Sequence, residues 1–149
     1  MELYNKLSKD MMDAMKSHDK DTLSTLRLLK SAIDLQKINN KLTEITDELV
    51  IEVASKQVKQ HKESITEFRN ANRDDLADNL EREIKIISNY LPEQLSKEEI
   101  IKEIDRIFDL VKPESKKDMG KIMKEANVSL KGKADFKLIS EIVNSKLGA

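Results

Sequence analysis

The residues between positions 131 and 137 form the pattern in this sequence that best fits a binding site. Lys131, Gly132 and Lys133 are consecutive, Asp135 follows, and Lys137 comes two residues later. Glycine adopts a positive φ without strain, so the chain can turn sharply at Gly132 before a helix begins. The first turn of a helix leaves backbone N–H groups unpaired, and lysines beside it attract anions. The stretch therefore predicts a site for an anion such as a nucleic-acid phosphate.

Further lysines precede this stretch at helical spacing. Lys117, Lys121 and Lys124 stand at positions i, i+4 and i+7, which places them on one face of a helix. A hairpin of two helices would set that face beside the turn at Gly132. The predicted nucleic-acid-binding residues are Lys117, Lys121, Lys124, Lys131, Gly132, Lys133 and Lys137.

An ordinary helix-to-helix turn is the alternative explanation of the same residues. Glycine between helices often serves backbone geometry alone. Asp135 would itself occupy the helix N-terminus, where its carboxylate competes with an external phosphate. Exposed lysines on a helix are also commonly a solvated face, as we expect for Lys56 and Lys59 further upstream.

Charge is distributed unevenly along the chain. The 149 residues carry 27 Lys/Arg and 28 Asp/Glu, a formal net charge of −1, so no overall attraction to polyanions follows. Residues 112–137, however, hold eight lysines and four acidic residues, a local net charge of +4. A polyanionic partner would therefore bind in the C-terminal part of the chain.

Most catalytic and metal chemistry finds no support in the sequence. The chain has no cysteine, and His18 and His61 are its two histidines, far apart in sequence. We therefore expect no catalytic residue, no metal and no cofactor. No apolar run approaches 18 residues, so a cytoplasmic protein without a membrane partner is the default expectation.

The scarcity of glycine and proline predicts an all-α protein with two domains. The chain has only three glycines and two prolines, which interrupt helices. Its apolar residues recur every three or four positions, as on one face of a helix. Pro92 ends the last of about four N-terminal helices, because its ring cannot continue the hydrogen-bond ladder. This break predicts an N-terminal helical domain at residues 1–92. A second domain of three short helices is predicted at residues 96–149. The predicted N-caps are Asp19 or Asp21, Thr46, Asn72, Ser96 in a capping box with Glu99, and Asp135.

Three segments together resemble the YqeY-like proteins, relatives of the tail of the GatB subunit of the tRNA-dependent amidotransferase. They are "TLRLLKSAI", the central run that contains "YLPEQLS", and the late pair "DMGKIM" and "KGKAD". The resemblance extends over nearly the whole chain and implies an all-helical fold. Met119 to Lys121 and Lys131 to Asp135 match its C-terminal motif.

The resemblance implies a tRNA-binding accessory protein, with an amidotransferase or another translation-related protein as a partner. It also brings the label of a carbon–nitrogen ligase with glutamine as amido-nitrogen donor, which we expect to be inherited from the larger enzyme. We expect the lysines to bind backbone phosphates by charge, since the sequence suggests no aromatic platform for stacking bases. The alternative is a protein-interaction adaptor, in which an apolar groove between helices receives a partner helix and no RNA binds.

Overall fold

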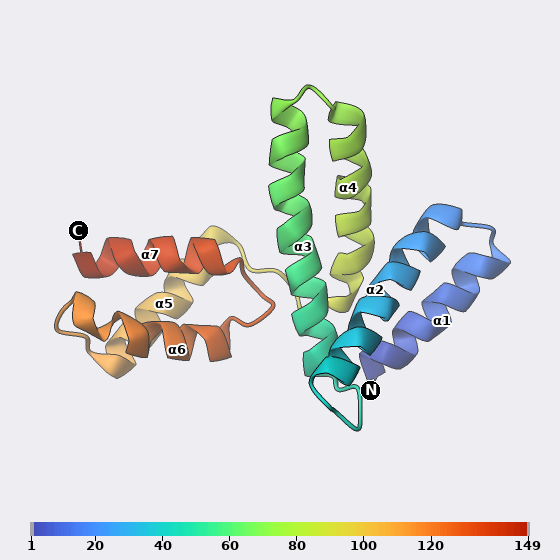
Figure 1. The fold of residues 1–149 in the computed structure, drawn as a ribbon. Coiled ribbons are helices and arrows are strands. Elements are labelled where there is room, and N and C mark those ends of the chain that lie inside the picture. Colours follow the sequence, from blue (N-terminus) through green and yellow to red (C-terminus); the bar gives the residue numbers. More distant parts are fainter. Residues whose placement is uncertain (1, 149) are drawn as a thin grey trace. The chain divides into compact units, whose positions relative to one another are not determined.

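The computed structural model describes residues 2–148, and within that range the chain is made of helices without a strand (Figure 1). The prediction of an all-α protein is confirmed. The chain divides into two compact units, Met1–Pro92 and Glu93–Ala149. Each unit has an aliphatic core of its own.

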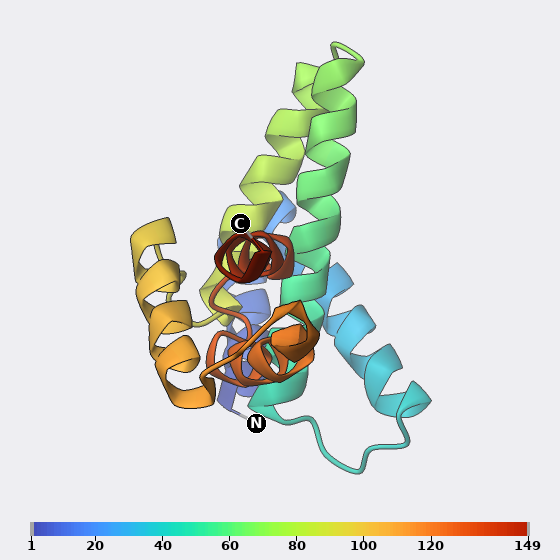
Figure 2. The ribbon, with the colours of Figure 1, turned by 90° about the vertical axis from the view of Figure 1, so that its left-hand side faces the viewer.

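The N-terminal unit contains two helical hairpins. Figure 1 and Figure 2 both show the third and fourth helices side by side as a long hairpin. Leu7, Leu29, Ile33 and Val50 are fully buried in the core that the helices share. The helices of this unit are α1 (Glu2–Lys16), α2 (Lys20–Asn39), α3 (Asp47–Asn70), α4 (Asp74–Ile87) and the 3₁₀ turn η1 (Ser88–Tyr90).

The starts of these helices follow the local sequence in two cases and depart from it in a third. The side chain of Asp19 accepts a hydrogen bond from the amide of Thr22, and that of Thr46 from the amide of Leu49. The predicted cap at Asn72 is wrong. Asn72 adopts a left-handed conformation with φ 58°, and α4 begins after Arg73 without a side-chain cap.

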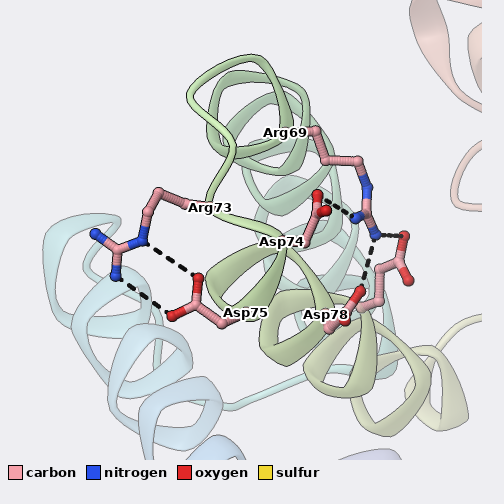
Figure 3. Close-up of polar contacts among 6 residues, drawn as sticks. Arg69, Arg73, Asp74, Asp75 and Asp78 are labelled. Atoms are coloured by element: carbon pink, nitrogen blue, oxygen red, sulfur yellow. Dashed lines mark hydrogen bonds and ion pairs between the residues drawn. The ribbon is translucent and has the colours of Figure 1, made fainter.

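Arginine side chains close the tip of the α3–α4 hairpin (Figure 3). The guanidinium of Arg69 at the end of α3 bonds Asp74, Asp78 and Glu81 of α4 at 3.1, 3.1 and 2.9 Å. Arg73 pairs with Asp75 on the other side of the tip. The acidic residues at the start of α4 also stabilise the helix through their interaction with its dipole.

The C-terminal unit is a small bundle of three helices. They are α5 (Lys97–Val111), α6 (Met119–Ser129) and α7 (Phe136–Gly148), with the 3₁₀ turn η2 (Lys116–Asp118) before α6. The predicted capping box is confirmed: the hydroxyl of Ser96 accepts from the amide of Glu99, and the carboxylate of Glu99 accepts from the amide of Ser96. Ile104, Ile122 and Val143, one from each helix, meet in the core.

Candidate nucleic-acid interface

The turn between α6 and α7 holds the central part of the predicted site. Gly132 has φ 74°, the left-handed conformation that only glycine adopts freely, as its place in the sequence predicts. The amide of Lys133 donates to the carbonyl of Leu130 at 2.9 Å, and Leu130 is buried. Lys131 and Lys133 are both exposed on either side of the glycine. The turn therefore presents two ammonium groups from a fixed backbone.

The segment before α5 holds this turn in place. The amide of Leu95 donates to the carbonyl of Lys133 at 3.0 Å, and Nε2 of Gln94 donates to the carbonyl of Gly132 at 2.5 Å. Sequence reasoning did not assign a role to Gln94. The signal was present, because Gln94 lies in the stretch "YLPEQLS" that carries the family resemblance.

Asp135 caps α7, as predicted. Its carboxylate accepts a hydrogen bond from the amide of Lys137 at 3.2 Å, and its carbonyl accepts from the amide of Ile139. A backbone donor of the first turn is therefore already satisfied, and a negative charge stands at the helix start. The attraction for an anion must come from the lysine side chains rather than from the end of α7.

Of the remaining predicted lysines, Lys137 lies near the turn, whereas Lys117, Lys121 and Lys124 are spread along η2 and α6. Lys117 is in η2, Lys121 and Lys124 are on α6, and Lys137 is the second residue of α7; all four are exposed. Because α6 has 11 residues, Lys117 lies about 16 Å from the turn along the helix. The structure thus places Lys131, Lys133 and Lys137 at one end and Lys117 with Lys121 at the other.

The carboxylates near the turn already have partners. Glu103 of α5 accepts hydrogen bonds from Nε of Arg106 at 2.9 Å and from the hydroxyl of Ser129 at 2.7 Å. The bonds from Arg106 and then from Ser129 hold the pKa of Glu103 below its ordinary value, and the charge of Lys133 acts in the same direction. Glu103 is therefore ionised at neutral pH, and its negative charge is largely compensated by Arg106, Ser129 and Lys133.

The predicted lysines differ in whether a carboxylate already pairs with their ammonium group. Nζ of Lys121 lies 3.8 Å from Asp118, whose carboxylate also accepts from the amide of Glu114 at 2.8 Å. Within residues 2–148, Lys117, Lys124, Lys131, Lys133 and Lys137 make no salt bridge. Of these, Lys133 already acts on the charge of Glu103, so the other four ammonium groups are the ones most available to an external anion.

A comparison with protein families identifies what kind of chain carries this arrangement. The family model described as Yqey-like protein matches residues 4–147. The chain belongs to the YqeY-like family. The matched residues of this YqeY-like chain include both helical units and the turn at Gly132.

Curated relatives of this YqeY-like chain come from fungi. It is 32% identical to altered inheritance of mitochondria protein 41 of Pyrenophora tritici-repentis over 148 residues, 97% of this chain and 80% of that protein. It is 38% identical over 90 residues to a protein of Schizosaccharomyces pombe, covering 60% of this chain and 72% of that protein. The match to protein 41 of Vanderwaltozyma polyspora is 35% identical and covers 46% of that protein.

The names of the protein 41 relatives place those proteins in mitochondria. For this chain, a cytoplasmic location stays a prediction. None of the helices described in residues 2–148 combines the length and the apolar character that crossing a bilayer requires. In the same residues, no three histidine or acidic side chains are grouped as a metal site.

Proposed function

We propose that this YqeY-like protein binds tRNA through its C-terminal unit and acts as an accessory protein. Lys131 and Lys133 would contact backbone phosphates, with Lys137 and Lys124 extending the contact. The observation that carries the proposal is the turn at Gly132, where two exposed ammonium groups project from a backbone fixed by main-chain hydrogen bonds. The neighbouring carboxylate of Glu103 is already bonded to Arg106 and Ser129.

The arrangement of the lysines supports contact with the backbone of a nucleic acid. The row from Lys117 to the turn extends about 16 Å, and phosphates follow one strand of a duplex at about 3.4 Å of axis each. Several consecutive phosphates could therefore lie along α6. Since lysine ammonium groups carry no base-reading geometry, this binding would depend on shape and charge rather than sequence.

The test is a titration of labelled deacylated tRNA at several salt concentrations. Each phosphate that a lysine neutralises contributes a slope of about −0.7 to −0.9 in log affinity against log salt. Three or four contacts predict a slope of about −2 to −4. The double change Lys131→Glu, Lys133→Glu should weaken binding severalfold without loss of helicity.

A matched control separates the turn from total charge. Lys56→Glu with Lys59→Glu changes the net charge equally, but on the exposed face of α3. Binding by this control should stay close to that of the unaltered protein. Equal losses in both double variants would assign the effect to overall charge and overturn the site.

Association with an amidotransferase is a further part of this proposal, and it rests on the family resemblance. The chain would hold tRNA while another protein performs amide transfer with glutamine as the nitrogen donor. An assay with misacylated tRNA, glutamine, ATP and the purified chain tests the label of a carbon–nitrogen ligase. Amidated product from the chain alone would contradict the accessory role.

A second candidate function is docking of a helix from a partner protein. Leu28, Leu35 and Ile38 on α2 are each more than half exposed, and Leu42 follows in the next loop. Positions 28, 35 and 38 are spaced by seven and three residues, which places them on one face of α2, the spacing that packs against a second helix. This apolar stripe is the observation that favours an adaptor.

Salt and nuclease distinguish the two candidates. A partner held by the stripe should remain bound in high salt after nuclease treatment, and should be lost from the variant Leu28→Ser, Leu35→Ser. A partner held through RNA should be released by both treatments and by Lys131→Glu with Lys133→Glu. Retention of the same partner by both double variants would contradict both docking modes.

A further inference from the structure

We propose that Phe136 stacks on an unpaired nucleotide base, so that the site at Gly132 takes single-stranded or looped-out segments in preference to duplex. The inference deepens the proposed function and rests on it, because the lysines must first bind the phosphates. The sequence alone suggests no aromatic platform for stacking bases. The exposure of this one ring changes that expectation.

Phe136 stands apart from the other aromatic residues of the chain. Its exposed fraction is 51%, whereas Tyr90 is buried and Phe68, Phe108 and Tyr4 are partly buried. Among residues 2–148 it is the one aromatic side chain that is exposed rather than buried or partly buried. An exposed aromatic ring beside lysines can contact the base of a nucleotide whose phosphates the lysines bind.

Phe136 stands close to two of the lysines along the chain. It is the first residue of α7 and is followed by Lys137, and Lys133 precedes it by three residues. Three residues of chain span at most about 10 Å. Side chains of a helix lean toward its N-terminus, which in α7 is the end joined to the turn that contains Gly132.

The half-buried state of the ring suits a stacking platform. Phe136 continues the apolar spacing of Ile139 and Val143, which are buried in the core, but it is not part of that core. About half of the residue therefore stays accessible to a ligand. An exposed aromatic ring can stack on any base, since every base has a π-face.

Ring and lysines together define the class of ligand. In a duplex, each base is covered by its neighbours, so its face is accessible only when the nucleotide is unpaired. Lys133 and Lys137 would hold the phosphates on either side of such a nucleotide. A single stacked base changes affinity by roughly five- to a hundredfold, which is large enough to set a preference.

Binding to paired and unpaired RNA tests the proposal. The probes are a labelled RNA oligomer of about ten nucleotides and the same oligomer in a duplex, with site sizes of this order typical for single strands. Phe136→Leu keeps the apolar bulk but removes the ring. It should lose at least about fivefold affinity for the single strand while duplex binding stays unchanged.

A fluorescence measurement gives a second, direct readout. The chain contains no tryptophan, so Phe136→Trp places one indole at the site. Stacking on a base should quench its emission as single-stranded RNA is added. Leu110→Trp is the matched control, because Leu110 is exposed on α5 about 20 Å along that helix from the segment that holds the turn. Its emission should not change.

The possible results separate this inference from the function it rests on. If the unaltered protein binds RNA through its lysines but Phe136→Leu binds single strands equally well, the stacking role is wrong and the proposed function stands. Equal losses on single strand and duplex would also reject stacking. If the unaltered protein binds neither probe at low salt, the proposed function itself fails.

Discussion

The amide of Leu95 donates a hydrogen bond to the carbonyl of Lys133 over 3.0 Å, joining the segment before α5 to the turn before α7. The two residues are far apart in sequence, yet this bond fixes the backbone that carries the predicted site. The side chain of Gln94 adds a second bond, to Gly132. The position of the lysines therefore depends on a segment that contains no basic residue of the site.

Removing the side chain of Gln94 should loosen the turn. Gln94→Ala deletes the bond to the carbonyl of Gly132, and a typical loss is about 1 kcal/mol of the free energy of unfolding. Hydrogen exchange at the amide of Leu95 should become faster at the same time. Glu93→Ala, at the exposed neighbouring position, is the control and should leave this exchange rate unchanged.

Two glycines of the C-terminal unit should respond to alanine in opposite directions. Gly132→Ala forces a side chain into φ 74°, which costs about 1–2 kcal/mol. Gly120→Ala places a methyl group where no atom lies within 4 Å, in the first turn of α6, and should stabilise by about 0.5–1 kcal/mol. Thermal unfolding of both variants measures this. A higher melting temperature for Gly132→Ala would show that the turn needs no glycine.

Acid should destabilise the C-terminal unit partly through Glu103. Its pKa is lowered by the bonds from Arg106 and Ser129, so the ionised form favours the folded state. This stability is present above the ordinary pKa of 4.5 and is lost as the pH falls through the lowered value. Glu103→Gln should cost about 1 kcal/mol at neutral pH and show a shallower acid loss in denaturant titrations. Glu141→Gln, exposed on α7, should retain the full acid dependence.

Alkali should act on the N-terminal unit through Tyr90. This residue is 1% exposed, and its hydroxyl donates to the carboxylate of Asp10 at 2.5 Å. Burial, and next the bond to Asp10, raise the pKa of the hydroxyl far above its ordinary value of 10. The protonated form thus stabilises the fold below pH 10, and this contribution is lost as the pH rises further.

The variant Tyr90→Phe tests that relationship. It should lower the free energy of unfolding by about 2 kcal/mol at neutral pH and reduce the alkaline loss. Asp10→Asn keeps an acceptor oxygen and should cost less. A Tyr90→Phe protein as stable as the original would show that the bond to Asp10 contributes nothing.

Local sequence determined the helices and several of their ends. Thr46, Asp135 and the box of Ser96 with Glu99 were predictable because each cap bonds a residue two or three positions away. The glycine turn was predictable for the same reason, since its φ is a property of one residue. Asn72 failed as a cap because the same short side chain also tolerates the left-handed conformation that it adopts here.

Tertiary structure determined which residues support the turn at Gly132 and which side chains near it are exposed. The bonds from Gln94 and Leu95 to the turn join residues 38 positions apart, and sequence spacing holds no information about such pairs. Packing of α7 determined that Phe136 stays half exposed while Ile139 is buried, although both fit one apolar stripe. The length of α6 likewise separated Lys117 from Lys131. Caps and turns are encoded by neighbours in the chain, but exposure and contacts across helices arise only when the core forms.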